Sequence, residues 1–349
     1  MKIEIHILQC FAPSCLNRDD TNTPKSCVFG GFPRSRISSQ CWKRAVRSYF
    51  RDTNSQLVGN RTKRLQALLI DKLGNSVSPE TITKFIVDCY SKMDGKNPAD
   101  TAVLLFIGNE EVEEAAACLR EKIDSKTAMA RLQNARKSVD LALFGRMLAE
   151  KPDGSIDAAC QVAHAISTHR VEMEDDFYTA VDDVLESRGE IGAGMMGVQG
   201  FNSACFYRYA LLDTDQLLTN LHGDTAITAE AISAFIEAFS MSIPSAKQNS
   251  HAAQNLPSFG LLAARDSGAP VSLANAFARP VRSEDIIAAS IDSLSDYHAR
   301  LNKVYGLYDN ATLAVFHDRE DDSCLRDLKN SDKGSLKAAT ATIMEQVRL

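Results

Sequence analysis

The first residues of the chain alternate between apolar and polar side chains. Ile3, Ile5 and Ile7 would lie on one face of an extended segment. Glu4 and His6 would then lie on the opposite face. This two-residue period predicts a half-buried strand over residues 2–8.

A helical pattern follows a long connection, residues 13–31, which is rich in Asn, Asp, Thr, Pro and Gly. Long connections without regular structure are often functional. Ser38 can cap the helix, with Ile37 and Trp42 as a hydrophobic staple. The apolar residues then repeat at helical spacing: Trp42, Ala45, Val46, Tyr49 and Phe50. The opposite face is predicted to present four cations: Lys43, Arg44, Arg47 and Arg51.

The remaining pattern mixes helices and strands. The pattern over residues 60–138 predicts helices. Residues 155–171 fit both the helical and the strand period, so either structure is compatible with this segment. Strands are predicted for residues 205–212, 259–265 and 271–277. Helices are predicted for residues 227–241 and 283–304. The order is typical of an α+β fold rather than of a regular βαβ alternation.

Composition describes a globular protein without a membrane segment. The chain has 349 residues, of which 44% are hydrophobic and 24% are charged. No apolar run approaches the ~18 residues that a membrane helix needs, so a cytoplasmic protein is expected. Nine cysteines, without a C-x2-C pair, favour reduced thiols over disulfides or a zinc site.

The net charge of −6 conceals an uneven distribution. Residues 1–51 contain nine basic and three acidic residues, a net +6, which leaves −12 for the rest. An acidic stretch with eight carboxylates and one arginine spans residues 172–190. The segregation predicts a local basic binding face, and the alternative is chance clustering on a solvated surface.

Three motifs point to chemistry, and each has a simpler interpretation. Asp19 and Asp20 could serve metal-assisted or general-base catalysis, but Asp is also a common turn former. A G-x-G-x-x-G motif over residues 192–197 lies past the midpoint and precedes no helix pattern, which favours a protruding loop over a nucleotide site. His164 and His169 are five residues apart, and this spacing does not place them on one helix face as a pair of metal ligands. Core or hydrogen-bonded histidines are therefore favoured.

Several strings of residues together carry a resemblance to a known family. They are Pro13–Asp20 (PSCLNRDD), Phe29–Gly31 (FGG), Arg36–Gln40 (RISSQ), Asp140–Met147 (DLALFGRM), Val162–His169 (VAHAISTH), Phe177–Asp183 (FYTAVDD), Phe206–Ala210 (FYRYA), Pro244–Gln248 (PSAKQ) and Ser272–Phe277 (SLANAF). With these strings in this order, the chain resembles the CasC family of the RAMP superfamily. CasC proteins are the backbone subunits of Cascade, the type I-E CRISPR surveillance complex of antiviral defence. The resemblance is weakest over residues 55–138.

The resemblance implies a three-part architecture and a set of partners. An RRM-like (ferredoxin-like) palm would comprise residues 1–55 and 139–349, a helical fingers insertion residues 56–138, and a thumb loop residues 188–202. Copies would polymerise as a helical filament along CRISPR RNA (crRNA), beside other Cascade subunits. The guide would then pair with target DNA in short segments. No membrane, cofactor or metal is implied.

The resemblance also transfers roles to individual residues. It implies RNA-backbone contacts for Arg18, Lys25, Ser38, Gln40, Lys43 and Arg44, with Lys247 and Gln248 as weaker candidates. Arg47 joins them on helical spacing alone. Met195, Met196 or Phe201 could wedge between bases, or could serve in ordinary core or hinge packing. The family's basic stretch after Gly-Gly is partly replaced by Phe32-Pro33.

Three functions remain open from the sequence. The leading hypothesis is a non-catalytic scaffold that grips crRNA through phosphates and leaves base edges free for pairing. An alternative is a guide-directed RNA endonuclease that uses Asp19 or Asp20. The third is a self-assembling structural protein that carries no nucleic acid.

Overall fold

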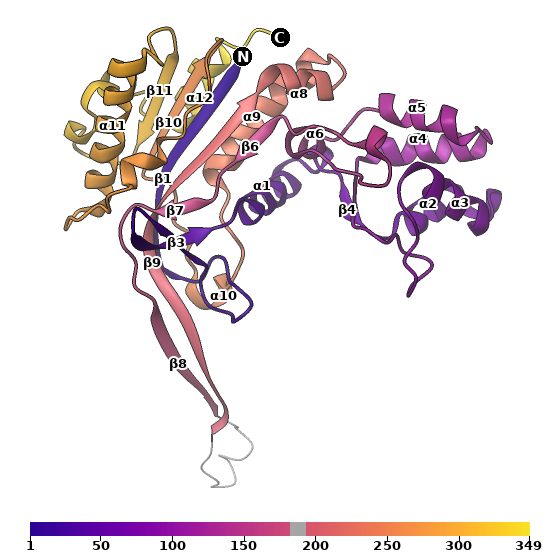
Figure 1. Cartoon of the computed structure of the whole chain (residues 1–349), viewed down its shortest axis with the longest axis horizontal. Helices are drawn as coiled ribbons and strands as arrows, with labels where there is room; N and C mark the ends of the chain where they lie inside the picture. Colours follow the sequence, from indigo (N-terminus) through magenta and orange to yellow (C-terminus); the bar gives the residue numbers. More distant parts are fainter. Residues whose placement is uncertain (182–192) are drawn as a thin grey trace.

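A large antiparallel sheet organises the protein. The computed structural model describes residues 1–181 and 193–349. In the nine-stranded sheet, the central strand β1 (Lys2–Ser14) pairs with β9 (Ala193–Asp213) on one side and with β10 (Phe259–Arg265) on the other. Strand β11 (Thr312–His317) lies outside β10 (Figure 1).

Short strands extend the sheet beyond β9. Strands β6 (Cys160–Val162) and β7 (Ala165–Ser167) both pair with β9, which resolves the ambiguous segment 155–171 as strands. Strand β7 pairs with β3 (Phe32–Ile37), and β3 forms a hairpin with β2 (Ser26–Phe29). The predicted connection 13–31 is therefore shorter than expected, because β1 runs to Ser14 and β2 begins at Ser26.

Helices cover both faces of the sheet. On one face, Ile3, Ile5 and Ile7 share a core with α1 (Ser39–Thr53) and α9 (Thr225–Met241). Three further helices border this core: α6 (Val139–Phe144), α8 (Thr214–Asn220) and α12 (Leu336–Met344). The opposite face is covered by α11 (Ile286–Tyr305) and by two 3₁₀ helices, η4 (Leu273–Phe277) and η5 (Ser323–Ser331).

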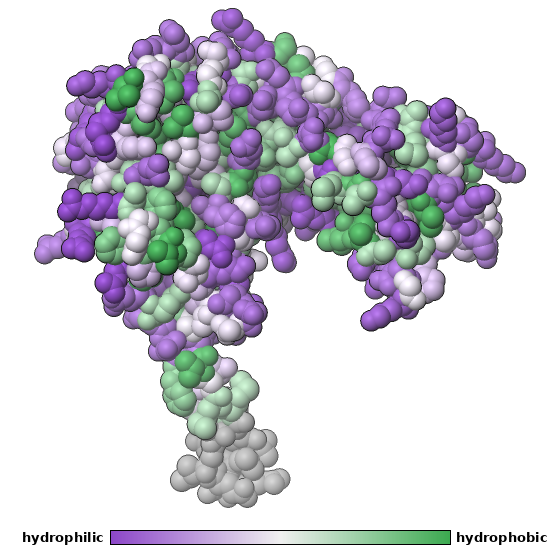
Figure 2. Space-filling view, viewed as in Figure 1, coloured by the Kyte–Doolittle hydropathy of each residue, from purple (hydrophilic) through white to green (hydrophobic). Residues whose placement is uncertain are grey.

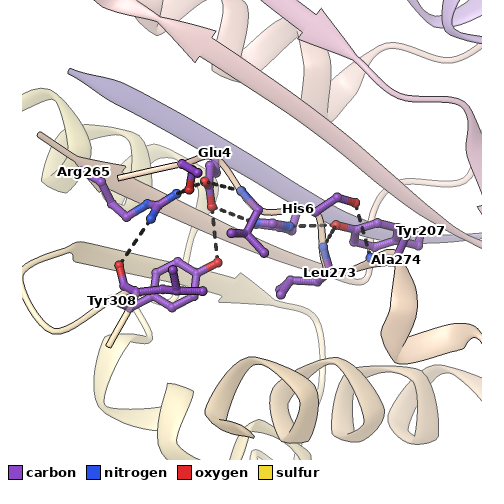
Figure 3. Close-up of polar contacts among 11 residues, drawn as sticks. Glu4, His6, Tyr207, Arg265, Leu273, Ala274 and Tyr308 are labelled. Atoms are coloured by element: carbon purple, nitrogen blue, oxygen red, sulfur yellow. Dashed lines mark hydrogen bonds and ion pairs between the residues drawn. The ribbon is translucent and has the colours of Figure 1, made fainter. Parts of the chain in front are cut away.

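Because both faces are covered, the prediction that β1 is half-buried was wrong. Glu4 and His6 are fully buried on the face beneath α11 and η4. Figure 3 shows the polar network that surrounds them. Glu4 forms an ion pair with Arg265, and the Nδ1 of His6 lies 2.9 Å from the hydroxyl of Tyr207. The polar half of the sequence pattern therefore marks a buried network instead of a solvated face.

A second core belongs to a helical cluster, which lies beside the sheet (Figure 1). It contains α2 (Leu65–Leu73), α3 (Pro79–Cys89), α4 (Asn109–Arg120) and α5 (Ser125–Asn134). A small sheet of β4 (Asn60–Thr62) and β5 (Leu105–Ile107), which the helical pattern did not predict, contributes Leu105 and Ile107 to this core. Short 3₁₀ turns occur at Ser55–Leu57, Gly74–Ser76 and Pro152–Gly154. The domain boundaries at residues 55 and 138 stay predictions.

A long hairpin projects from the sheet, opposite the end where the chain termini lie (Figure 1). Strand β8 (Glu174–Val181) pairs with the first part of β9, from Glu174 opposite Phe201 to Val181 opposite Ala193. Residues 188–192 of the predicted thumb loop lie outside the described residues. The loop prediction is wrong for residues 193–202, because they form a strand of this hairpin.

Most of the other predicted elements are confirmed. The strands 205–212 and 259–265 lie in β9 and β10, and the two late helices correspond to α9 and α11. The strand predicted over residues 271–277 is wrong: the segment leads into the 3₁₀ helix η4. In the described part of the chain, no helix is long and apolar enough to span a bilayer.

Candidate nucleic-acid interface

The N-terminal loop folds back onto the start of α1. The side chain of Asn17 accepts a hydrogen bond from the backbone N–H of Ser38 (N···O 2.9 Å), and its carbonyl accepts one from Lys25 (2.8 Å). The carbonyl of Lys25 in turn accepts from the N–H of Arg36 (2.8 Å). These bonds join the loop, the β2–β3 hairpin and the helix N-terminus into one surface.

Ser38 caps α1 as the sequence predicts. Its hydroxyl accepts a hydrogen bond from the N–H of Cys41 (3.3 Å), and the residue is 6% exposed. Ser39 is partly exposed and Gln40 is exposed. The N-terminal end of a helix carries a partial positive charge and backbone donors, which suit a phosphate. The structure therefore gives Ser38 a capping role and leaves Gln40 open to a ligand.

Cations from separate segments gather around this helix end. Burial raises the pKa of the Cys41 thiol to about 11, and the charges of Arg44 and Lys25 oppose that rise. Burial raises the pKa of Cys15 in the same way, and Arg18 and Lys247 oppose it. Arg44 and Lys25 therefore lie near Cys41, and Arg18 and Lys247 lie near Cys15. The two thiols are linked, because the Sγ of Cys41 lies 3.7 Å from the carbonyl of Leu16, the residue after Cys15. We call Arg18, Lys25, Arg36, Arg44 and Lys247 the basic cluster.

Sequence reasoning did not assign Arg36 to the interface. Its guanidinium lies 2.9 Å from the Nδ1 of His164 and donates to the carbonyl of Ser26 (3.3 Å). Partial desolvation lowers the pKa of His164, and the charges of Arg36 and Lys25 lower it further, which favours the neutral imidazole. The available signal was the position of Arg36 at the start of the RISSQ motif.

Lys43 lies apart from the basic cluster. It is partly exposed, and its ammonium lies 5.7 Å from the centroid of the Phe144 ring. Burial raises the pKa of Cys160 to about 12, and the charge of Lys43 opposes that rise. Lys43 therefore extends the positive surface along α1, toward α6.

Arg47 does not share the exposed cationic face, so the prediction from helical spacing was wrong. The residue is 8% exposed, and its Nε donates to the carboxylate of Asp140 (2.7 Å). Its Nη2 donates to the carbonyl of Gly59 (3.0 Å), and Asp140 also accepts from the N–H of Gly59 (2.8 Å). A buried carboxylate compensates the buried guanidinium, which explains why the side chain turns inward.

Lys247 and Gln248 lie at the base of the projecting hairpin. The Nζ of Lys247 donates to the side chain of Gln199 (2.8 Å), and Gln248 begins the short helix α10 (Gln248–His251). The side chain of Gln248 donates inward, to the carbonyl of Pro244 (2.9 Å). A hollow of about 560 Å³ is lined here by Pro13, Asp176, Tyr178, Gln199, Phe201, Lys247, Ser250 and His251. Lys247 thus contributes a cation to an aromatic-lined hollow, whereas Gln248 is engaged within the loop.

The three predicted wedge residues have different surroundings. Met195 and Met196 are 56% and 66% exposed, and as neighbours in a strand they lie on opposite faces of the hairpin. Phe201 is half-buried, with its ring centroid 6.1 Å from that of His251. Figure 2 shows the apolar surface along the described hairpin. Core packing is therefore excluded for the two methionines, which are free to meet a ligand.

Asp19, the first residue of the acidic pair Asp19–Asp20, is held by hydrogen bonds within its own turn. The carboxylate of Asp19 accepts hydrogen bonds from Thr21 (N···O 2.9 Å) and Thr23 (3.1 Å), and the bonds from Thr21 lower the pKa of Asp19 most. Asp20 is exposed. Within residues 1–181 and 193–349, no group of three or more His, Cys, Asp or Glu residues is placed to hold a metal ion. The turn-forming interpretation of Asp19 is thus supported.

The other candidate motifs also have structural roles. Gly194 and Gly197 lie in the strand β9, so the interpretation as a nucleotide-binding loop is excluded at these positions. The Nδ1 of His169 lies 2.8 Å from the carbonyl of Arg170, and its Nε2 accepts from the N–H of Cys205 (3.2 Å). His164 is exposed and lies between β6 and β7. All nine cysteines are free thiols.

The described residues form a mixed α/β protein with a nine-stranded antiparallel sheet, a separate helical cluster and a projecting hairpin. Over residues 3–342 the chain matches the model of a family described as "CT1975-like protein", and it belongs to that family. Its resemblance to CasC is confirmed.

Two solved structures are similar over their whole length. One is a chain of a "CRISPR RNA-guided surveillance complex, pre-nicking", with 29% identity and a TM-score of 0.85 over 98% of this chain and 100% of that chain. The other is a chain of a "CRISPR RNA-guided surveillance complex", with 28% identity and a TM-score of 0.67 over 99% and 100%. No curated protein matches the chain.

Proposed function

We propose that this protein is a non-catalytic backbone subunit of a CRISPR surveillance complex, which polymerises along crRNA and presents the guide for pairing with target DNA. The observation that carries the proposal is the basic cluster. Its cations come from the N-terminal loop, β3, α1 and the segment before α10, and they lie near Cys15, Cys41 and His164.

The chemistry of the basic cluster suits the RNA backbone. Guanidinium and ammonium groups, together with helix-end N–H groups, bind phosphates of any sequence. Such contacts leave the base edges free, which a guide strand needs in order to pair. Arg18, Lys25, Gln40, Lys43 and Arg44 are proposed as phosphate contacts, and Arg36 is added to them. Lys247 is proposed to approach the RNA beside the aromatic hollow.

The sheet order supports an RRM-like palm. The strands β10, β1, β9 and β7 are neighbours in that order and are antiparallel. In chain order they are the fourth, first, third and second strands, and α1 and α9 share one face. This order is the one expected of a ferredoxin-like fold, and it supports that part of the proposal. The helical cluster within residues 56–138 is proposed as the fingers.

The hairpin is proposed as the thumb. The projecting part begins at Glu174, so the proposed thumb is longer than the loop 188–202. Its exposed methionines would unstack guide bases at regular intervals, as apolar wedges do in other complexes. The other proposed partners are neighbouring copies, further Cascade subunits, and target DNA through the crRNA.

A triple substitution tests the proposal. We expect Lys25→Ala, Lys43→Ala and Arg44→Ala together to weaken the binding of single-stranded RNA, whatever its sequence. The logarithm of the binding constant decreases linearly with the logarithm of the salt concentration. This negative slope should become shallower by about 2, since each lost phosphate contact changes it by about 0.7. Fluorescence anisotropy with labelled RNA across a salt series measures both quantities.

The matched control removes three exposed lysines from other surfaces: Lys84→Ala, Lys126→Ala and Lys303→Ala. It makes the same change in net charge, so its affinity and slope should stay close to those of the wild type. Equal binding by the two triple variants would contradict the basic cluster as the RNA site.

Two simpler experiments separate the alternative functions. A self-assembling protein without nucleic acid would show the ultraviolet spectrum of pure protein after purification, whereas the scaffold should retain RNA. An endonuclease would cut complementary RNA at regular intervals with Mg²⁺, and Asp19→Ala or Asp20→Ala would abolish cleavage. We expect no cleavage, because the carboxylate of Asp19 is occupied by Thr21 and Thr23.

A further inference from the structure

We propose that Arg34 is a positioning residue for the basic cluster. From the interior, it holds the β2–β3 hairpin against η4 and thereby fixes Lys25 and Arg36 where they can meet phosphates. The inference rests on the proposed function, and it concerns a cation that itself cannot touch RNA, because Arg34 is only 1% exposed.

The guanidinium of Arg34 joins three segments of the chain. Its Nη1 donates to the carbonyl of Ser167 in β7 (2.8 Å), and its Nη2 donates to the carbonyl of Phe277 in η4 (2.7 Å). Among the described residues, all of its hydrogen-bond acceptors are backbone carbonyls, and none is a carboxylate. Burial lowers the pKa of Arg34. A buried charge without a counter-charge is costly, so its bonds to the carbonyls must be maintained.

The tip of the hairpin meets the same segment as Arg34 does. Gly30 adopts a φ of +60°, and a Cβ at this position would lie 1.7 Å from the carbonyl oxygen of Ala278. Only glycine allows this approach of the two backbones. Arg34 and Gly30 therefore dock the hairpin onto Phe277 and Ala278 at two separate points.

The segment that receives Arg34 is anchored in the buried network of Figure 3. The N–H of Leu273 donates to the hydroxyl of Tyr207 (2.8 Å), and the N–H of Val271 donates to Glu4 (2.9 Å). Arg265 pairs with Glu4 and donates to the carbonyl of Ala269 (2.7 Å). The carbonyls of Phe277 and Ala278 that Arg34 uses thus follow a segment that is tied to the centre of the sheet.

From Arg34 the hairpin leads directly to two phosphate-binding candidates. Arg36 lies two residues along β3, and Cys27 is the cross-strand partner of Arg34. Lys25 lies two residues before Cys27, and its carbonyl accepts from the N–H of Arg36. A cation that is already held in place loses less conformational entropy when it binds a ligand. Displacement of Arg34 should therefore weaken the contacts of both Lys25 and Arg36.

The test substitutes Arg34→Gln in the full chain and measures single-stranded RNA binding across a salt series. The expected result is weaker binding with a salt slope lowered by about 0.7 to 1.4, which corresponds to one or two lost phosphate contacts. In a double-mutant cycle with Lys25→Ala, the combined loss should be smaller than the sum of the single losses. Hydrogen exchange should become faster at the amides of residues 25–37.

Arg146→Gln provides the matched control. Arg146 is also a buried arginine, with its side chain 5% exposed, and it donates to the carbonyls of Phe106 and Gly154. Unlike Arg34, it also pairs with a buried carboxylate, that of Glu111 (2.9 Å). It lies outside the basic cluster, so the control should lose stability and keep the wild-type salt slope. Arg34→Lys retains the charge but cannot bridge both carbonyls, and it should behave like Arg34→Gln if position rather than charge is what matters.

Gly30→Ala keeps the inference testable if Arg34→Gln does not fold. It disturbs the docking without altering any cation, and it should lower the affinity and the salt slope in the same direction. The inference is overturned if Lys25→Ala weakens binding while a folded Arg34→Gln or Gly30→Ala protein binds as the wild type does. If Lys25→Ala and the triple variant also bind normally, the proposed function fails instead.

Discussion

One buried charge, that of Arg208, packs against an aromatic ring. Arg208 is fully buried, and its guanidinium lies 3.6 Å from the centroid of the Trp42 ring and contacts Gln9 and the carbonyl of Phe239. Burial lowers the pKa of Arg208 to about 9. The apolar stripe of α1 therefore rests on a cation, which contributes an aromatic contact as well as hydrogen bonds.

His298 in α11 should make the stability of the fold depend on pH. The residue is 5% exposed, and burial together with a smaller effect of His6 lowers its pKa to about 4, against the opposing charges of Glu4 and Asp327. An unfolded histidine titrates near about 6.5. As the pH falls from about 6.5 to 4, the unfolded chain takes up a proton that the folded chain does not, so the free energy of unfolding should fall by up to about 3 kcal/mol.

Urea denaturation at a series of pH values measures this contribution. His298→Phe, which keeps a ring beside Tyr308, should show a flatter pH dependence between pH 4 and about 6.5. His222→Asn, at an exposed position with a φ of +57° that Asn tolerates, serves as the control and should retain the wild-type dependence. The same pH dependence in His298→Phe as in the wild type would contradict the prediction.

The exposed methionines of the projecting hairpin should matter for the guide RNA and not for the stability of the fold. Met195→Ser with Met196→Ser should leave the free energy of unfolding nearly unchanged, because both side chains are more than half exposed. If the hairpin unstacks the guide, 2-aminopurine placed at successive guide positions should fluoresce periodically with the wild type. The periodic signal should weaken in the double variant.

The control removes two other exposed apolar side chains, Val304→Ser and Tyr305→Ser, from the end of α11. Both positions are 68% exposed, so this variant loses apolar surface comparable to that of the methionine variant. It should keep the periodic fluorescence. Loss of the signal in both variants would indicate a general effect of surface polarity and would count against the hairpin.

Elements differed in how far local sequence defined them. The capped and amphipathic α1 was predicted from Ser38 and its apolar repeat, since both signals act within a few residues. The segment before Phe277 was predicted as a strand, but its N–H groups bond to Glu4 and Tyr207, which are far away in sequence. Those partners, which decide its conformation, could not be found from local periodicity.

The acidic residues that balance the basic N-terminal segment should repel stray nucleic acid from the rest of the molecule. The exposed carboxylates of Glu172, Glu174, Asp175 and Asp176 lie at the start of the hairpin. Like charge repels the phosphates of stray nucleic acid. Replacing all four with the matching amides should raise the affinity for random duplex DNA at low salt, as measured by gel shift.

The control neutralises four exposed carboxylates elsewhere: Asp71→Asn, Glu80→Gln, Glu284→Gln and Glu320→Gln. Its net charge changes by the same amount, so it separates the position of the charge from the total. Equal DNA binding by the two variants would indicate that only net charge matters, and unchanged binding by both would exclude the repulsion.

The sequence alone established the α+β class, the main late helices and strands, the N-terminal excess of positive charge and the resemblance to CasC. Each of these depends on residues close together in the chain or on their order along it. Tertiary structure decided which cations reach the surface. Arg47 turned inward because a buried Asp140 lies beside it, whereas Arg36 and Lys247 contact His164 and Gln199, which are distant in sequence. It also buried Glu4 and His6, because only the packed helices on the second face of the sheet exclude water from that side of β1.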